Sequence, residues 1–262
     1  MKNEIRTLAL EKVEFGVGDR TILQPLTTTL SGRGVTGLVG QNGSGKSTLL
    51  KLLARQQRAT SGRIAFGGRA IEEWSDREFA RKVAYLPQHT PLAAGLLVRE
   101  LVAMGRYPWH GALGRFGPAD QAAVDEALAL TGTDTIADRF VETLSGGERQ
   151  RAWFAMLVAQ QAQLLLLDEP ISALDVAHQV AVLRLVRRLS EEHGVGVVIV
   201  IHEINMAARF CDQMIALKNG SLIAQGPPAE LMTTEQLEAI YEVHMGTLEH
   251  PDTHSSMAYV RF

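Results

Sequence analysis

Cysteine is almost missing from this chain: Cys211 is the only one among 262 residues. A single cysteine excludes an internal disulfide and fits a reducing compartment, and we expect Cys211 to be a small buried hydrophobe. Long apolar runs are missing too, because "LLLLD" and "VGVVIVIH" fall far short of the roughly 20 residues that span a bilayer. The start, "MKNEIRTLALEKVEF", lacks the apolar region and cleavage site of a signal peptide. We therefore expect a cytoplasmic chain that reaches a membrane only through a partner.

An excess of either charge is also absent. The net charge is −3, so no basic surplus points to nucleic acid as a partner. Apolar residues make up 46% and charged residues 21% of the chain, as in soluble globular proteins. The length suits one compact core that carries an inserted subdomain.

Short apolar stretches between turn residues predict β-strands in the first third of the chain. We expect these strands at 7–15, 27–30, 35–39, 62–68 and 82–87. From 88 to 161 the periodicity is helical, with Pro118 suited to a first helical turn and Gly132 to a helix end. The stretch "GALGRFG" (111–117) predicts a loop within this helical region.

Strand patterns return after the helical region. "QLLLLDEP" (163–170) and "VGVVIVIH" (195–202) are nearly continuous apolar runs, typical of strands buried on both faces of a parallel sheet. Strand, helix and strand in this order predict a right-handed βαβ unit. Asn219-Gly220 between two apolar runs predicts a hairpin turn. The helix between the two buried strands ends before Gly194 and carries apolar residues at helical spacing, namely Val176, Val180, Leu183, Val186 and Leu189.

The stretch "GQNGSGKS" (40–47) fits the pattern G-x-x-x-x-G-K-[ST], between a predicted strand and a predicted helix. Gly43 and Gly45 let the backbone curl around a phosphate with its N–H groups inward, and the helix N-terminus adds partial positive charge. Lys46 would reach the β- and γ-phosphates, and the Ser47 hydroxyl would bind Mg²⁺. A dinucleotide fingerprint does not fit, since "GSG" continues into "KST". The loop predicts a purine nucleoside triphosphate and leaves the reaction open.

Two carboxylates follow the buried "LLLL" run. Asp168 lies at the predicted carboxyl end of the strand, where α/β sheets bind ligands, and is a candidate partner for Mg²⁺. Glu169 would point elsewhere and could orient and polarise an attacking water. The alternative, a solvated turn, is disfavoured next to a phosphate loop.

The stretch "LSGGERQ" (144–150) opens the predicted helix "RQRAWFAMLVAQ". This heptapeptide is the signature sequence of the ATP-binding cassette (ABC) ATPases. Together with Gln88 in "YLPQH", "SALD" (172–175) and His202 at a strand end, the chain resembles that family in its full motif order and over essentially its whole length. Kinases and GTPases share only the phosphate loop.

The resemblance implies a fold and a domain division. The fold class would be α/β, with a P-loop NTPase (RecA-like) core of mostly parallel sheet, an N-terminal antiparallel β subdomain and an inserted α-helical subdomain. The core with its C-terminal extension would comprise 1–87 and 162–262, and the insert with the signature motif 88–161.

The resemblance also assigns site residues. Glu169, His202 and Gln88 would be catalytic: His202 would contact the γ-phosphate and hold the water near Glu169, and Gln88 would report the nucleotide state to the insert. Ser145 and Gly147 begin a helix, and in the family this loop binds the ATP that sits on the P-loop of a second copy. Mg²⁺ would be held by Ser47, Gln88 and Asp168. ATP would be bound by Gly40, Gln41, Asn42, Gly43, Ser44, Gly45, Lys46, Ser47, Thr48, Val17, Ser145, Gly146 and Gly147.

The sequence departs from the family pattern at three places. Where most members stack an aromatic ring on adenine, "EFGVGDRTIL" places Val17, with Phe15 two residues earlier as a possible substitute. Ile171 stands where Thr is usual and Glu203 where Asp is usual, and neither removes a group that the chemistry needs.

The sequence of the insert indicates which branch of the family the chain resembles. "LLVRELVAMGRYPWHGALGRF" resembles the ATPases of bacterial importers for iron–siderophores, haem and cobalamin, and "GRYPWHGALGRFG" is most similar to the ferric hydroxamate branch. The implied partners are a second copy of the chain, a membrane permease docked on residues around 88–109, and indirectly a periplasmic siderophore-binding protein. The chain would lie at the cytoplasmic face of the inner membrane. A haem or cobalamin importer ATPase, or a soluble ABC ATPase without a permease, remain the alternatives.

Overall fold

The computed structural model describes residues 7–91, 93–111, 114–172 and 174–262. Two predicted features therefore lie partly outside the described residues: the loop at 111–117 and the "SALD" stretch at 172–175. The chain divides into two compact units. One comprises Met1–Ile71 and Gly196–Phe262, and the other Glu72–Val195.

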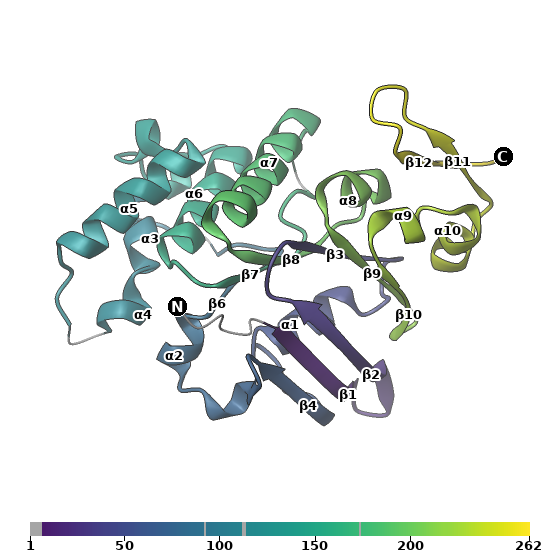
Figure 1. Cartoon of the computed structure of the whole chain (residues 1–262). Coiled ribbons are helices and arrows are strands. Elements are labelled where there is room, and N and C mark those ends of the chain that lie inside the picture. The colour runs from purple at the N-terminus through teal and green to yellow at the C-terminus, as the bar shows by residue number, and fades with distance from the viewer. Residues whose placement is uncertain (1–6, 92, 112–113, 173) are drawn as a thin grey trace. The chain divides into compact units, whose positions relative to one another are not determined.

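The first unit begins with an antiparallel sheet in the order β2-β1-β4-β5 (Figure 1). Its central strand, β1 (Thr7–Val17), pairs with β2 (Arg20–Ser31) on one side and β4 (Ser61–Phe66) on the other, and β5 (Arg69–Ala70) is the edge. Alternate residues of β1 are buried, as the sequence pattern predicts for a half-buried strand.

A second sheet of the first unit holds β3 (Val35–Val39) between two parallel neighbours, β8 (Gly196–Val200) and β9 (Gln213–Lys218). Every residue of β3 and β8 is buried, which confirms the strands expected from the continuous apolar runs. β10 (Ser221–Gly226) adds an antiparallel edge through a two-residue turn. α1 (Lys46–Leu53) follows β3 and contacts both β2 and β8.

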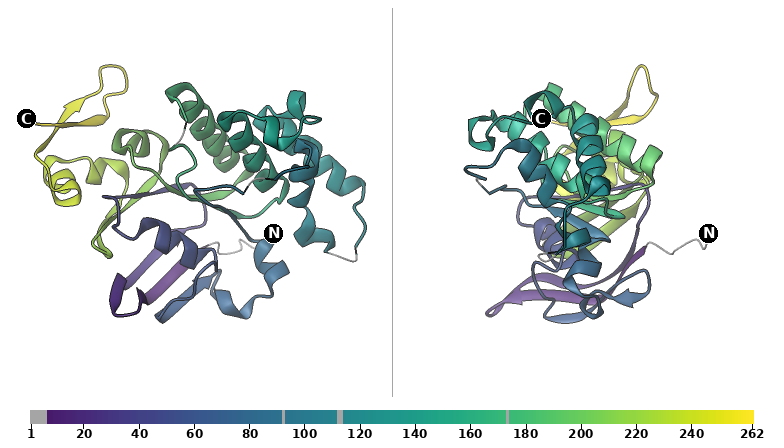
Figure 2. Two further views of the ribbon diagram at one scale, coloured as in Figure 1. Left: turned by 180° about the vertical axis from the view of Figure 1, so that it is seen from behind. Right: turned by 90° about the vertical axis from the view of Figure 1, so that its left-hand side faces the viewer.

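The β9–β10 turn confirms the predicted hairpin. Asn219 and Gly220 have φ of +49° and +78°, as a turn matched to the twist of antiparallel strands requires. The remaining elements of this unit are α8 (Ile204–Phe210), α9 (Pro228–Leu231), α10 (Thr234–Tyr241), β11 (Met245–Glu249) and β12 (Ser256–Val260). The last two form the hairpin that carries the C-terminus (Figure 2).

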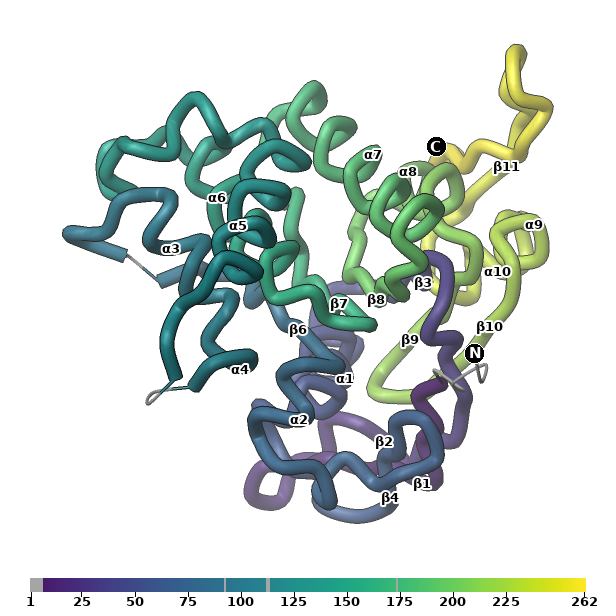
Figure 3. The backbone as a smooth tube through the Cα atoms, turned by 60° about the vertical axis from the view of Figure 1, so that its left-hand side comes forward, coloured from purple at the N-terminus to yellow at the C-terminus, as the bar shows by residue number. Residues whose placement is uncertain are grey.

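The second unit pairs β6 (Val83–Leu86) in parallel with β7 (Leu164–Leu167), both within the predicted strands. Its helices are α2 (Asp76–Ala80), α3 (Val98–Met104), α4 (Tyr107–His110), α5 (Pro118–Thr131), α6 (Gly146–Ala159) and α7 (Val176–His193). α3, α5 and α6 pack together around an apolar core (Figure 3). Pro118 is the first residue of α5 and Gly132 ends it with φ of +61°, both as predicted.

The predicted helix between the buried strands is confirmed as α7, and Gly194 ends it in the left-handed conformation. Its predicted apolar face is wrong at one end, because Val176 is 68% exposed. Val176 is the first helical residue, directly after the Asp175 cap, and the buried side chains begin six residues later at Val182.

Candidate functional site

The glycines of the phosphate loop occupy backbone positions that favour glycine over other residues. Gly40, directly after β3, has φ of +135°, and a Cβ there would lie 2.1 Å from the carbonyl oxygen of Leu217. Gly43 and Gly45 have φ of +78° and +99°, and a Cβ on Gly45 would meet the Leu23 side chain at 2.6 Å. Positive φ at three glycines lets the chain turn back on itself between strand and helix. The loop predicted from the sequence therefore has the curled backbone that a phosphate cradle needs.

Lys46 is the first residue of α1 and is only 4% exposed. Its Nζ donates to the carbonyl oxygens of Gly40 at 2.9 Å and Gln41 at 2.7 Å, and to Ser44 Oγ at 3.4 Å. The ammonium group is thus held inside the curl of the loop, where the helix N-terminus adds its own partial positive charge. Both features favour an anion at this point.

His202 lies at the same edge of the sheet as the phosphate loop. β3 and β8 are parallel, with Leu38 opposite Val200, so two residues further along come Gly40 and His202. The imidazole is exposed. The carboxyl ends of adjacent parallel strands are where α/β sheets bind ligands, so His202 lies at an edge of the sheet that suits ligand binding.

The two candidates for the adenine contact lie in different surroundings. Val17, the last residue of β1, is 62% exposed, whereas Phe15 is buried at 9% exposure. The Phe15 ring belongs to the core of the antiparallel sheet, so of the two side chains only Val17 offers its surface to a ligand.

Asp168 directly follows β7 and is 1% exposed. Its backbone N–H donates to the Leu86 carbonyl at 2.9 Å, and its Oδ2 accepts from the Tyr85 hydroxyl at 3.3 Å. Burial raises the pKa of Tyr85, and the negative charge of Asp168 raises it further, so the phenol stays a hydrogen-bond donor. The strand end thus presents a fixed carboxylate.

Glu169 has an unusual backbone for a residue other than glycine, with φ of +50°. Its carbonyl accepts from Ser172 Oγ at 3.1 Å, and its Oε2 accepts from Gln88 Nε2 at 2.7 Å. Strained backbone of this kind is concentrated at functional sites. Gln88 and Glu169 also line a cavity of about 200 Å³, together with Arg149.

The signature stretch begins α6 as predicted. Ser145 is the N-cap, its Oγ accepts from the Glu148 N–H at 3.3 Å and donates to Glu148 Oε2 at 2.8 Å, and its own N–H donates to the same oxygen at 2.8 Å. These bonds lower the pKa of Glu148, with the Ser145 N–H as the largest cause and Arg139 as a further one. Gly146 and Gly147 form the first turn, with the N–H groups that favour an anion.

Three residues of these surroundings were not predicted from the sequence. Tyr85 lies in "YLPQH" and Arg149 in "LSGGERQ", but the roles expected for these motifs fall on other residues. No spacing rule identifies Tyr85 or Arg149. His178 bonds Asp175 through Nδ1 at 2.8 Å, and a Cβ on Gly147 would lie 3.5 Å from its ring. The capping pattern S-x-x-E at Ser145 could have predicted the Glu148 contact.

Comparison with known proteins defines the family. The model of the family described as ABC transporter matches residues 23–172. The chain belongs to the ABC transporter family. It is 41% identical to the iron(3+)-hydroxamate import ATP-binding protein of Bacillus subtilis, over 95% of the chain and 93% of that protein. It is 38% identical to the ferric enterobactin transport ATP-binding protein of Escherichia coli, over 96% and 93%.

Solved ABC proteins share the fold. An ABC transporter in an inward-facing conformation matches with a TM-score of 0.84 and 27% identity, over 98% of this chain and 97% of that one. The cassette MJ0796, a dimer with ADP and phosphate, matches with a TM-score of 0.74 and 25% identity, over 84% and 98%. The predicted fold class is confirmed, and the chain is an ABC ATPase that binds ATP. The roles and domain bounds given above stay predictions.

No helix within the described ranges is both long and apolar enough to cross a membrane. Nor do the described side chains include a group of three or more His, Cys, Asp or Glu placed to hold a metal ion. The predicted Mg²⁺ ligands contain a single carboxylate, Asp168, beside a hydroxyl and an amide. Mg²⁺ sites with one carboxylate take their other ligands from phosphates and water.

Proposed function

We propose that this ABC ATPase hydrolyses ATP to drive a bacterial importer of ferric siderophores of the hydroxamate type. The observation that carries the proposal is the 41% identity, over 95% of the chain, to a protein whose name specifies iron(3+)-hydroxamate import. A second candidate cargo is haem, because the hemin import ATP-binding protein of Bordetella avium is 39% identical over 94% of the chain.

In this proposal Lys46 and the loop N–H groups hold the β- and γ-phosphates of ATP. Ser47, Gln88 and Asp168 would supply oxygen ligands to Mg²⁺, an ion that would neutralise charge on the phosphates when bound. Hydroxyl, amide and carboxylate oxygens are hard donors, which suit this ion. Val17 contributes an aliphatic contact to the base.

Glu169 acts as the general base that takes a proton from the attacking water. Gln88 Nε2 holds one of its carboxylate oxygens at 2.7 Å and so fixes the orientation of the group. His202 contacts the γ-phosphate. Because Gln88 is the first residue of the region 88–161, a change at Glu169 would reach the start of that region through one hydrogen bond.

A second copy of the chain completes each nucleotide site. The N-terminus of α6, with Ser145 and Gly147, would bind the γ-phosphate of ATP held by the other copy. Support comes from MJ0796, a related cassette solved as a dimer. ATP would then join the two copies and hydrolysis would release them.

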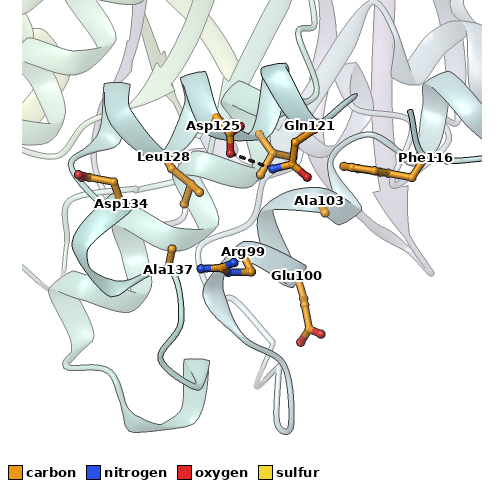
Figure 4. A pocket seen from close by; sticks show the side chains of 10 residues that line it. Arg99, Glu100, Ala103, Phe116, Gln121, Asp125, Leu128, Asp134 and Ala137 are labelled. Carbon is orange, nitrogen blue, oxygen red and sulfur yellow. Dashed lines mark hydrogen bonds between the residues drawn. The ribbon is translucent and has the colours of Figure 1, made fainter. Parts of the chain in front are cut away.

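The permease would dock on the surface around residues 88–109, where α3 borders a cavity of about 470 Å³ that it shares with α5 (Figure 4). Val124 and Leu128 of its lining are buried. The acidic lining residues Glu100, Asp125 and Asp134 are exposed and outnumber the basic Arg99. A basic cytoplasmic segment of a permease fits this chemistry, since loops on that side are rich in Lys and Arg. The chain would lie at the cytoplasmic face of the inner membrane, with a periplasmic binding protein delivering the cargo to the permease.

Iron uptake tests the proposal. Cells that lack this chain are expected to lose uptake of radioactive iron supplied as a ferric hydroxamate, and the wild-type chain should restore it. Lys46→Ala should fail to restore it, because the phosphate loop loses its buried charge. Lys51→Ala, a change at a second lysine of the same helix, is the control and should restore it.

Parallel uptake assays with haem and with a ferric catecholate identify the cargo. Uptake that depends on the chain for haem alone would replace the hydroxamate with the second candidate. Uptake of all three cargoes without the chain would contradict the proposal.

A further inference from the structure

The C-terminal segment, residues 233–262, lies beyond the part of the chain that the family model matches. It contacts the phosphate loop through Gln41, and it contacts α8, the helix that begins two residues after His202. α10, β11 and β12 are grouped at the same end of this unit as α8, the helix that follows His202 (Figure 1). α8 also contacts β12 directly.

One attachment joins the segment to the phosphate loop. The Nε2 of Gln41 donates to the Tyr241 carbonyl at 2.5 Å and to Glu242 Oε2 at 3.4 Å. Both acceptors stand at the end of α10, where Glu242 ends the helix with φ of +58°. A side chain of the loop thus bonds a helix end that is 200 residues away in the sequence.

The end of α10 is itself fixed by charge. Lys218 Nζ bonds Glu242 Oε1 at 2.9 Å and the Ala239 carbonyl at 2.9 Å. The Lys218 ammonium, with a smaller contribution from Gln41, lowers the pKa of Glu242 below its ordinary value. The acceptors for Gln41 are therefore held in place by β9, the strand next to β3.

The other attachment joins the segment to α8. Asn205 Nδ2 donates to the Ala258 carbonyl at 3.0 Å, and the Ala258 N–H donates to Asn205 Oδ1 at 2.7 Å. The amide side chain of Asn205 thereby bonds both the N–H and the carbonyl of Ala258, as the backbone of a neighbouring strand would. Asn205 lies in the first turn of α8, three residues after His202.

We propose that residues 233–262 act as a brace that positions the phosphate loop and the His202 turn, with Gln41 and Asn205 as the positioning residues. The inference rests on the proposed ATP hydrolysis at these loops. The Gln41 bond and the Asn205 pair lie at different parts of the site, so we expect their loss to change different constants, the affinity for ATP and the turnover number. Loss of the Gln41 bond loosens the loop that holds the phosphates, and loss of the Asn205 pair loosens the turn that contacts the γ-phosphate during reaction.

The test measures the dissociation constant of ATP and the turnover number separately. Gln41→Ala is expected to raise the dissociation constant about 3- to 10-fold, the range for one lost hydrogen bond of this kind. Asn205→Ala is expected to lower kcat about 3- to 10-fold, with the dissociation constant within about twofold of wild type. Asn205→Asp keeps the acceptor for the Ala258 N–H and should recover part of kcat.

Gln225→Ala is the matched control. Gln225 also makes two bonds across the first unit, accepting from Thr28 Oγ1 and donating to the Thr29 carbonyl at 3.0 Å, but it touches neither loop. We expect both constants to stay at their wild-type values. Ala258→Pro removes the N–H that donates to Asn205 Oδ1 and keeps the carbonyl that accepts from Asn205 Nδ2. It should therefore lower kcat in the same direction as Asn205→Ala, and it provides a second variant if Asn205→Ala fails to fold.

Wild-type protein measured in the same assay distinguishes a failure of the proposed ATP hydrolysis from a failure of the proposed brace. Absence of ATP hydrolysis by the wild type would contradict the proposed function. Hydrolysis by the wild type together with an unchanged kcat in Asn205→Ala or Ala258→Pro would overturn the brace. Equal effects of Gln225→Ala and Asn205→Ala would overturn it too, because general loss of stability would then explain both.

Discussion

Asp120→Ala should severely destabilise the second unit. Arg106 and Asp120 form a buried ion pair with 2.9 Å between Nε and Oδ1, and their side chains are 6% and 12% exposed. Arg106 Nη1 also donates to the Ala159 carbonyl at 2.8 Å and to Gln161 at 2.9 Å, so the guanidinium cannot swing out to water without breaking further bonds. The alanine variant leaves this cation buried without its counter-charge.

Removal of one partner of a buried ion pair costs about 3–5 kcal/mol. Asp120 Oδ2 also accepts from the Gly117 N–H at 3.0 Å at the start of α5, so the variant loses a helix cap as well. For a chain of this size about 1 kcal/mol shifts Tm by about 2–4 °C, which gives a fall of roughly 6–20 °C. Urea unfolding followed by circular dichroism measures the free energy, and calorimetry measures Tm.

Asp138→Ala is the control, because Asp138 pairs with Arg99 on the surface at 76% and 51% side-chain exposure. An exposed pair contributes about 0–1 kcal/mol, so its loss should change Tm little. A free energy of unfolding for Asp120→Ala within about 1 kcal/mol of wild type would refute the reasoning from burial.

The pH dependence gives a second check. The hydrogen bond from the Gly117 N–H is the largest cause that lowers the pKa of Asp120 from its ordinary value of 3.8, and the hydrogen bond from Arg106 is the second. A lowered pKa stabilises the fold at pH values above 3.8, and this contribution disappears as the pH falls through the lowered value. The difference between wild type and Asp120→Ala should therefore be constant near neutral pH and shrink below about pH 4.

Two further substitutions test the loops. Gly40→Ala would place a Cβ 2.1 Å from the Leu217 carbonyl, and we expect it to abolish ATP binding in a fluorescent-nucleotide titration; wild-type affinity would contradict the backbone described here. Ser145→Ala removes the cap of α6 and should cost about 0.5–2 kcal/mol of unfolding free energy in urea. An unchanged free energy of unfolding would show that the Ser145 hydroxyl does not stabilise the start of α6.

Local patterns predicted the strands and the phosphate loop because each depends on neighbouring residues. The apolar run before His202 folds as β8, and Asn219-Gly220 forms the predicted turn between β9 and β10. Both predictions succeed because periodicity and turn chemistry are short-range properties. The phosphate loop likewise follows from the spacing of its glycines, Lys46 and Ser47 between a predicted strand and a predicted helix.

Contacts between distant residues were not predictable in this way. Asn205 and Ala258 are 53 positions apart, and nothing in either stretch indicates that an amide will pair with that strand. The bond between Gln88 and Glu169 spans 81 positions and depends on how β6 and β7 align. Val176 fits a helical apolar face by spacing, yet it is exposed because it begins the helix.

The central claim is that two copies of this chain bind ATP between them and that Glu169 takes the proton from water. Glu169→Gln tests it most directly, because the amide keeps an oxygen for the bond from Gln88 and loses only the basic group. We expect this variant, given Mg²⁺ and ATP, to elute as a stable dimer with bound ATP in size-exclusion chromatography and to have almost no turnover. A variant that stays monomeric with ATP would contradict the ATP-bound dimer, and one that hydrolyses ATP at the wild-type rate would contradict the role of Glu169.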